Sequence, residues 1–386
     1  MQPYGDPLEE RLLCITIVGP THPYKGGIAR HTTELAHRMA TAGHTVTLES
    51  WSAQYPGFLY PGQLKVDVPE GEPFPATERR LSWRRPDGWW RAGRRIRGAD
   101  LAVLVVPASI QAPAYLTALA GLGRQVSTVA LCHNVLPHER RPFDVPLMRM
   151  LLRRVDEVVV HSSAQAELAR TLTSRTVRVA EMPAHLPPAV HACAASRTTE
   201  HRRLLFFGVV RPYKGLDVLL RALAAGPEDL TLTIAGEFWS GVANTEDLIA
   251  RLGLTDRVEV RPGYVPSDQI PQLFAAADAL VLPYRSATSS QNVWMAHEHG
   301  VPVIATRVGS FPEQVRDGLD GLLCEPDDVA SLAGALRRFY SPGELTRLRA
   351  GVRPVDADPQ WAAYLEIITA ACRSSPGSGE LMPEQA

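Results

Sequence analysis

The most informative stretch of this 386-residue chain is Phe206-Phe207-Gly208-Val209-Val210-Arg211-Pro212-Tyr213-Lys214-Gly215. Its apolar first half is typical of a buried strand, and a helical pattern follows it. The tetrapeptide Pro-Tyr-Lys-Gly also occurs at residues 23–26, again between an apolar run and a helical pattern. At such a turn, backbone N–H groups and the positive end of a helix can bind a phosphate, and a lysine adds a compact charge. One such loop in each half predicts two nucleotide-binding domains that face a shared cleft.

Short apolar runs alternate with helical patterns along the chain, which is typical of α/β proteins with parallel sheets. The strands expected in the first half are residues 12–18, 45–48, 101–106, 126–131, 158–160 and 177–179. Those expected in the second half are residues 204–209, 230–235, 258–260, 279–282, 301–305 and 321–323. We therefore expect two Rossmann-like domains, followed by a helix and a tail. The expected bounds are 10–185 and 203–355 for the domains, 186–202 for the linker, 356–373 for the helix and 374–386 for a disordered tail.

The composition excludes several classes of protein. Forty basic and 41 acidic residues nearly cancel, so the chain lacks the basic field of a nucleic-acid-binding protein. The five cysteines are scattered and form no C-x-x-C motif, which favours a reducing, cytoplasmic setting. No apolar run reaches the roughly 18–20 residues of a membrane span, and the first apolar run lacks the layout of a signal peptide.

Arg211 and Lys214 are the strongest candidate site residues. They lie at the expected carboxyl end of a strand, which is where open α/β sheets bind ligands. Two fixed cations there suit a diphosphate, whose negative charge grows when it leaves. The alternative is a pair of solvated surface charges. Further along, Ser289 or Ser290 is suited to cap a helix whose N–H groups point at an anion.

Taken together, these motifs resemble the family 4 glycosyltransferases of the GT-B architecture. The matching pieces are the early Gly-Gly loop, Phe-Phe-Gly-x-x-Arg-Pro-Tyr-Lys-Gly, Gly-Tyr-Val-Pro at 263–266, and Gly-Val-Pro-Val-Ile-Ala-Thr at 300–306 with the turn at 309–313. The resemblance covers residues 12 to about 372. It implies two Rossmann-like domains with a C-terminal helix that returns to the first. It also implies metal-free transfer from a UDP- or GDP-linked sugar, with retained configuration, to a saccharide, lipid-linked or small-molecule hydroxyl.

The resemblance also implies roles for individual residues. The donor diphosphate would contact Arg211 and Lys214, and the transferred sugar would lie by His133, which is otherwise a satisfied histidine at a strand end. The implied donor-binding residues are Gly26, Gly27, Gly263, Tyr264, Val265, Ser289, Ser290, Gln291, Asn292 and Glu313. No metal ligands and no cofactor are implied.

One departure keeps other functions open. The family usually has two glutamates before the Gly-x-Pro-Val turn, and this chain has Ala287 and Met295 at those places. A non-catalytic sugar-nucleotide-binding relative is therefore an alternative, as is a sugar-nucleotide epimerase of the same architecture.

Residues 79–97 contain eight arginines with three tryptophans among them. Because the first domain of the family holds the acceptor, this strip is a candidate contact for anionic lipid or a lipid-linked acceptor. The alternative interpretation is a solvated helix that precedes the strand at 101–106, with its tryptophans partly in the core.

Overall fold

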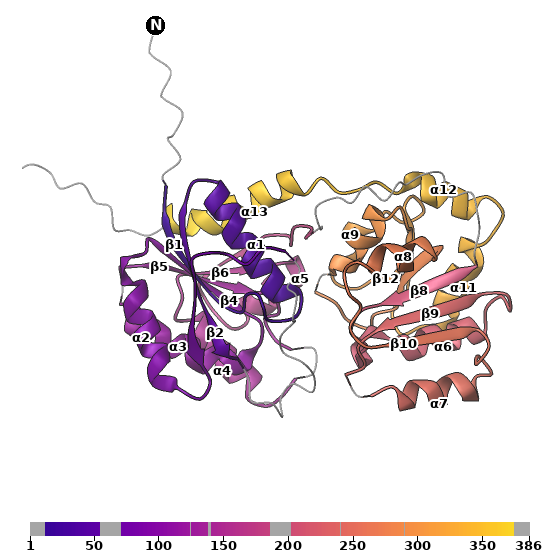
Figure 1. Cartoon of the computed structure of the whole chain (residues 1–386), viewed down its shortest axis with the longest axis horizontal. Coiled ribbons are helices and arrows are strands. Elements are labelled where there is room, and N and C mark those ends of the chain that lie inside the picture. The colour runs from indigo at the N-terminus through magenta and orange to yellow at the C-terminus, as the bar shows by residue number, and fades with distance from the viewer. Residues whose placement is uncertain are drawn as a thin grey trace, which may run out of the picture. The chain divides into compact units, whose positions relative to one another are not determined.

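The computed structural model describes residues 12–54, 71–123, 125–137, 140–185, 202–239, 241–288 and 290–373 (Figure 1). The chain divides into two compact units. The first extends to Glu181 and resumes at Trp361, and the second runs from Met182 to Gln360. The last helix, α13 (Ala357–Arg373), therefore begins in the second unit and continues in the first. The expected linker lies outside the described residues except for Arg202, and the expected tail at 374–386 lies wholly outside them.

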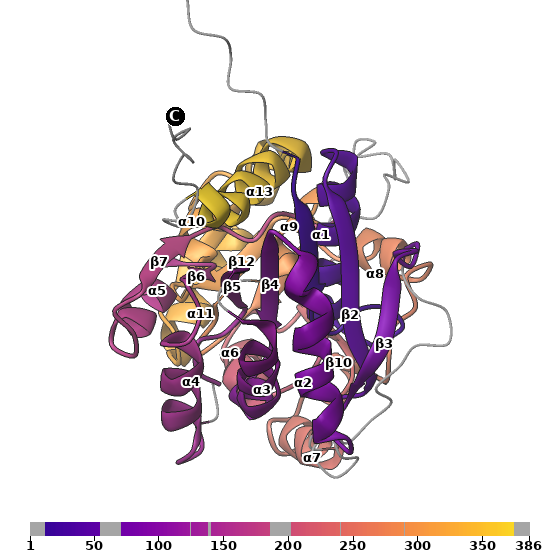
Figure 2. The same cartoon turned by 90° about the vertical axis from the view of Figure 1, so that its left-hand side faces the viewer.

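The first unit is built on a parallel sheet of seven strands in the order β3-β2-β1-β4-β5-β6-β7. The strands are β1 (Cys14–Val18), β2 (Thr45–Ala53), β3 (Thr77–Ser82), β4 (Leu101–Val106), β5 (Ser127–Cys132), β6 (Glu157–Val160) and β7 (Thr176–Val179). The helices before α13 are α1 (Gly27–Thr41), α2 (Pro86–Arg95), α3 (Ala112–Leu122), α4 (Asp144–Leu152) and α5 (Ser163–Arg170). Helices α2, α3 and α4 lie over one face of the sheet, while α13 lies beside α1 (Figure 2).

The solvated-helix interpretation of the arginine-rich strip at 79–97 is wrong in one respect, because the strip does not form a single helix. Its first part belongs to the edge strand β3, and its second part forms α2. The polar run Thr77-Glu78-Arg79-Arg80 lacks the apolar alternation that identifies a strand, because an edge strand needs only part of one face buried. The sheet neighbour β2 therefore decides the conformation of this segment through backbone pairing.

The second unit has a six-stranded parallel sheet in the order β10-β9-β8-β11-β12-β13. Its strands are β8 (Arg203–Phe207), β9 (Thr231–Gly236), β10 (Val258–Pro262), β11 (Ala279–Leu282), β12 (Val303–Thr306) and β13 (Gly321–Cys324). Its helices are α6 (Leu216–Ala224), α7 (Ala243–Arg251), α8 (Ile270–Ala275), α9 (Gln291–Glu298), α10 (Phe311–Gln314), α11 (Val329–Phe339) and α12 (Glu344–Gly351). The expected strand at 204–209 ends earlier, at Phe207, because Gly208 has a φ of +101° and turns the backbone away.

The strand orders explain where ligands can bind. In each sheet the chain starts near the middle, moves to one edge and then returns to build the other side. The order reverses between β1 and β4 in the first unit and between β8 and β11 in the second. Ligands of doubly wound folds bind at the carboxyl ends of the strands beside this reversal. Both Pro-Tyr-Lys-Gly loops follow such a strand. The predicted fold class, α/β with two Rossmann-like domains, is confirmed.

Candidate functional site

The loop between β8 and α6, residues 208–215, is a tight turn that holds both predicted cations. Residues Pro212–Lys214 form one turn of 3₁₀ helix, and Gly215 then begins α6 with a φ of +65°. A Cβ atom on Gly215 would lie 2.0 Å from the carbonyl oxygen of Pro283. Only glycine therefore allows the loop to pack this closely against the end of β11.

Aromatic rings support the two cations. The guanidinium of Arg211 lies over the half-buried Trp239, and the ammonium of Lys214 lies 5.1 Å from the ring centroid of Tyr284. Burial lowers the pKa of Lys214; the charge interaction with Tyr213 opposes this in part, and the positive charge of Arg211 adds a smaller lowering. Among the described residues, none accepts a hydrogen bond from the Lys214 ammonium. A half-buried cation of this kind gains from an anionic ligand.

Arg285, which the sequence interpretation did not select, stabilises the loop at 208–215 through hydrogen bonds. Its guanidinium donates two hydrogen bonds of 2.8 Å to Asp217 and one of 2.8 Å to the carbonyl oxygen of Pro212. Its backbone N–H donates to the carbonyl oxygen of Tyr213 at 2.7 Å. Burial alone would raise the pKa of Asp217, but the hydrogen bonds and charge of Arg285 outweigh it and keep that pKa below its usual value. An arginine just after a strand and an acid in the first turn of a helix were the available sequence signals.

The amino end of α9 meets the same loop. Ser290 caps this helix by accepting a hydrogen bond from the N–H of Asn292 at 3.3 Å. The Asn292 side chain donates to the carbonyl oxygen of Phe207 at 3.0 Å. A Cβ atom on Gly208 would lie 3.5 Å from the amide nitrogen of Asn292 and 3.6 Å from the Lys214 ammonium nitrogen. The structure thus gathers several predicted residues around the end of β8. Ser289 lies outside the described residues.

Gln291 has a structural role that the sequence did not indicate. Its side-chain oxygen accepts a hydrogen bond from the N–H of His185 at 2.9 Å, and its side-chain nitrogen donates to the carbonyl oxygen of Pro183 at 3.0 Å. The amide therefore fastens the segment at which the chain enters the second unit. Its predicted contact with the donor stays a prediction.

The remaining predicted residues of the second unit lie after β10 and in the short helix α10. Gly263 follows β10, and its N–H donates to Gly236 at 2.9 Å, while the neighbouring Tyr264 is 44% exposed. Val265 packs against the core beneath. Glu313 is exposed in the short helix α10.

The two positions that usually hold glutamates are apolar in character here. Ala287 and Met295 both pack against the hydrophobic core on the α9 side of the sheet. The Ala287 methyl has no hydrogen-bond acceptor, and the Met295 thioether is only a weak one.

In the first unit, Gly26 and Gly27 form the exposed start of α1. Gly26 has a φ of +103°, which favours glycine, and a Cβ atom on either residue would meet nothing within 4 Å. Open space therefore lies beside this backbone, as a ligand-binding turn requires.

His133 follows β5 and is almost fully buried, at 4% exposure. Its ring centroid lies 5.0 Å from that of His31 and 4.9 Å from that of His161. His161 follows β6, and its Nδ1 lies 3.0 Å from the carbonyl oxygen of Ala180. Burial lowers the pKa of His161 to about 4. The structure therefore places His133 among other histidines rather than alone at a strand end.

Two family models match the chain. The model described as Glycosyltransferase Family 4 matches residues 25–181, and the model described as Glycosyl transferases group 1 matches residues 201–341. The chain belongs to family 4 of the glycosyltransferases.

Individual relatives of this family 4 chain agree with the assignment. A D-inositol 3-phosphate glycosyltransferase of Mycobacterium sp. strain KMS is 35% identical over 150 residues, which are 38% of this chain and 34% of the relative. The alignment thus spans only about a third of that relative's length. Among solved structures, the sucrose-phosphate synthase of Thermosynechococcus elongatus superposes with a TM-score of 0.70 at 18% identity, covering 94% of this chain and 100% of the other. Anabaena HepE, solved with UDP-glucose, superposes with a TM-score of 0.67 at 18% identity and the same coverage. These structures share the GT-B fold.

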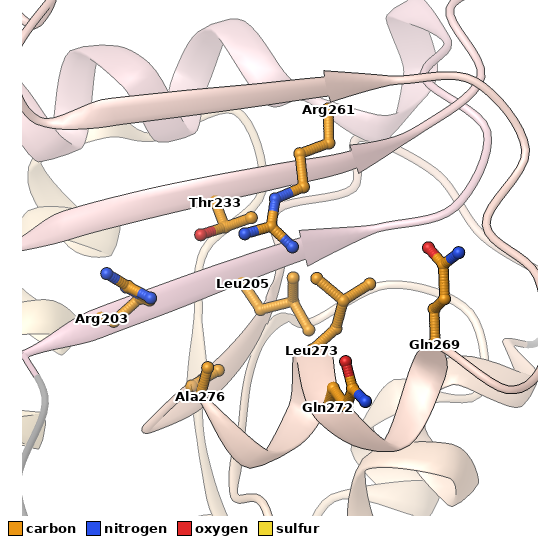
Figure 3. A pocket seen from close by; sticks show the side chains of 9 residues that line it. Arg203, Leu205, Thr233, Arg261, Gln269, Gln272, Leu273 and Ala276 are labelled. Atoms are coloured by element: carbon orange, nitrogen blue, oxygen red, sulfur yellow. The ribbon is translucent and has the colours of Figure 1, made fainter.

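A cavity elsewhere in the second unit contains none of the predicted site residues. It has a volume of about 250 Å³ and lies between the sheet and α8 (Figure 3). Arg203, at the start of β8, and Thr233 contribute polar groups, while Leu205 and Leu273 are apolar. Because Arg203 lies at the opposite end of β8 from the loop at 208–215, this cavity is separate from the candidate site.

Metal-binding clusters and membrane-spanning helices are both absent from the described residues. No group of three or more His, Cys, Asp or Glu side chains in this part of the chain is arranged to hold a metal ion. Within the same residues, no helix is long and apolar enough to cross a membrane.

Proposed function

We propose that this protein transfers a glycosyl group from a nucleoside-diphosphate sugar to a hydroxyl acceptor, with retention of the anomeric configuration. The observation that carries the proposal is the placement of Arg211 and Lys214 at the end of β8, beside the order reversal of the sheet. The amino ends of α6 and α9 lie at the same place and add their positive dipole ends.

The chemistry follows from this charge arrangement. The bond between the anomeric carbon and the β-phosphate oxygen breaks, and the diphosphate leaves with additional negative charge. Cations aimed at that charge lower the barrier because they interact more strongly with the departing group than with the intact donor. The acceptor hydroxyl attacks on the face that the diphosphate leaves, and its proton passes to the departing phosphate oxygen. In this scheme the charge is balanced by Arg211, Lys214 and the helix ends, without a metal ion or a cofactor.

The donor is proposed to be linked to uridine or guanosine diphosphate. HepE, which shares the fold, has been solved with UDP and with UDP-glucose. Uridine nucleotides are therefore the first donors to test. In the proposal, Gly263, Tyr264 and Val265 border the base, and the backbone at Gly26 and Gly27 contacts the diphosphate.

The acceptor is proposed to be a hydroxyl of a saccharide, a lipid-linked glycan or a small natural product. The Mycobacterium relative is named for D-inositol 3-phosphate, and the fold neighbour of Thermosynechococcus elongatus is named for sucrose phosphate. The apolar packing of Ala287 and Met295 favours one rival, a non-catalytic protein that binds a sugar nucleotide. An epimerase of the same architecture is the second rival, and analysis of the sugar product separates it from a transferase.

A thermal-shift panel of UDP, GDP and ADP with their glucose and mannose derivatives tests the donor. A ligand that binds the native state raises the unfolding midpoint by mass action, so the correct nucleotide should stand out. Release of the nucleoside diphosphate from the best donor then measures turnover. Arg211→Ala and Lys214→Ala should each abolish the shift or greatly weaken it, whereas Arg251→Ala, an exposed arginine at the end of α7, should not. The proposal is wrong if both site variants retain the wild-type shift and turnover.

We also propose that α2 brings the first unit to an anionic membrane surface. Trp90 is 43% exposed, and the guanidinium of Arg94 lies 5.0 Å from its ring centroid. By contrast, Trp89 is half-buried and donates a hydrogen bond to the carbonyl oxygen of Ser82 at 2.9 Å. An exposed indole beside arginines is suited to the headgroup region of a bilayer.

A further inference from the structure

Five aromatic side chains meet in the interior of the first unit, and we call them the histidine cluster. They are His31 of α1, His133 after β5, His161 after β6, and Trp361 and Tyr364 of α13. Each of the five is at most 4% exposed. The cluster therefore joins one predicted catalytic residue to a helix that begins more than 200 residues later in the chain.

His31 connects α13 to His133. The Nε2 atom of His31 lies 2.8 Å from the hydroxyl oxygen of Tyr364, and its ring stacks on Trp361 with a centroid distance of 5.5 Å and an interplanar angle of 22°. The His31 ring also meets the His133 ring at 5.0 Å with an angle of 88°. The His31 imidazole thus contacts two side chains of α13 and packs against the imidazole of His133.

His161 forms the other wall of the His133 site. Its Nδ1 must carry a proton, because the carbonyl oxygen of Ala180, 3.0 Å away, can only accept a hydrogen bond. Burial lowers the pKa of His161 to about 4, so the ring is neutral near pH 7. A neutral imidazole with a fixed tautomer can pack against His133 without repelling it.

We propose that His31 and Tyr364 are positioning residues that hold the His133 imidazole in the orientation in which it contacts the transferred sugar. The inference rests on the proposed function and extends it to α13, which would otherwise serve only to complete the fold. The physical reason is that an imidazole has two rotatable side-chain bonds, and His133 is held by ring contacts with His31 and His161. A change in the tilt of His31 therefore reaches His133 directly.

The Tyr364 hydroxyl is the part of this arrangement that can be removed cleanly. Burial raises the pKa of Tyr364 well above its ordinary value, so the hydroxyl keeps its proton throughout the range of an activity assay. Tyr364→Phe preserves the ring that packs against His31 and His161 and deletes only the hydrogen bond.

The first test compares Tyr364→Phe with Thr369→Val, which removes another buried hydroxyl of the same helix outside the cluster. With the best donor of the thermal-shift panel, Tyr364→Phe should lower kcat for nucleoside-diphosphate release about tenfold, because small displacements of a catalytic group are costly. The donor KM should stay within about twofold, since the diphosphate contacts are unchanged. Thr369→Val should keep the wild-type kcat. Equal kcat values for the wild type and Tyr364→Phe overturn the inference.

A double-mutant cycle with His133→Ala supplies the second test. If Tyr364 acts through His133, adding Tyr364→Phe to His133→Ala should lower kcat no further. Independent, additive losses would show a merely structural role and overturn the inference. If His133→Ala itself has wild-type kcat, the inference and the assigned role of His133 both fail, while the transfer proposal based on Arg211 and Lys214 stands.

Long-range ¹⁵N–¹H NMR of the histidine rings gives a readout that needs no turnover. The ring nitrogens of His31 and of His133 should both shift in Tyr364→Phe, because one ring passes the change to the other. Shifts confined to His31 would overturn the inference.

Discussion

The guanidinium carbon of Arg211 lies 4.5 Å from the centroid of the Trp239 ring. Trp239 comes from the loop after β9, and its backbone N–H donates a hydrogen bond to the carbonyl oxygen of Val210 at 3.2 Å. The neighbouring strand thus fixes both the backbone beside Arg211 and the direction of its charge. A cation held over an aromatic face loses less freedom when an anion binds.

Trp239→Ala should weaken the binding of UDP, or of whichever nucleoside diphosphate the thermal-shift panel selects. The expected loss is about three- to tenfold, which corresponds to roughly 1 kcal/mol for a partly exposed cation–π pair. Isothermal titration calorimetry measures the dissociation constant. Trp239→Phe keeps an aromatic face, so its nucleotide affinity should lie between those of the wild type and Trp239→Ala. An unchanged affinity in Trp239→Ala would contradict a supporting role.

Arg285→Lys should loosen the loop at 208–215 while keeping the charge. A lysine cannot reproduce the two parallel hydrogen bonds to Asp217 or the bond to Pro212. Because these groups remain partly in water, the thermal midpoint should fall by only about 2–4 °C. Affinity for the nucleotide should fall with it. Arg307→Lys changes an ion pair between a more exposed arginine and Asp317 and is the matched control, for which neither quantity should change measurably.

Nucleotide affinity should depend on pH through Lys214. Burial lowers the pKa of this ammonium, so its charge is lost at a lower pH than for an ordinary lysine. Affinity should therefore fall as the pH rises through that lowered pKa, and binding near it should take up a proton. Calorimetry in buffers of different ionisation enthalpy detects the proton. Lys214→Arg stays charged and should lose this dependence, and the same pH dependence in both proteins would exclude Lys214 as its source.

The first unit should lose stability in mild acid because of His161. Its pKa is about 4 in the fold and 6.5 in the unfolded chain, so below pH 6.5 the unfolded chain binds a proton that the fold does not. The stabilisation is complete above pH 6.5 and is lost as the pH falls toward 4, by about 3 kcal/mol in total. Urea unfolding at pH 7, 5.5 and 4 should show a shallower decline for His161→Asn than for the wild type. His37→Asn, outside the cluster on α1, should follow the wild type.

Membrane contact through α2 should depend on Trp90 and Arg94. Co-sedimentation with vesicles of phosphatidylcholine and phosphatidylglycerol should exceed that with phosphatidylcholine alone, and added salt should reduce it. The variant Trp90→Ala/Arg94→Ala should lose most of this binding, whereas Arg170→Ala on α5 should not. Equal sedimentation with both kinds of vesicle would exclude an electrostatic membrane site.

The loop at 208–215 shows how much of the structure can be predicted from the sequence. An apolar run, a glycine and two cations before a helical pattern were enough to predict a strand and a turn, and the anion site that they also indicate stays a prediction. They could not reveal Arg285, because its partner Asp217 is 68 residues away and only the adjacency of β8 and β11 brings the two together. Likewise, Gln291 was selected for its place in a Ser/Gln-rich run, and its bonds to Pro183 and His185 depend on where the chain enters the second unit.

Local pattern therefore specified the alternation of strands and helices, the two Pro-Tyr-Lys-Gly turns and the family, since periodicity and turn chemistry reside in neighbouring residues. Local pattern did not predict the polar edge strand β3, because pairing with β2 rather than its own composition makes it a strand. The contact of His31 with Tyr364 joins residues 333 apart and exists only because α13 packs beside α1. Packing of distant elements decided which side chains surround His133 and Arg211, because no short stretch of chain contains information about a neighbour that only folding provides.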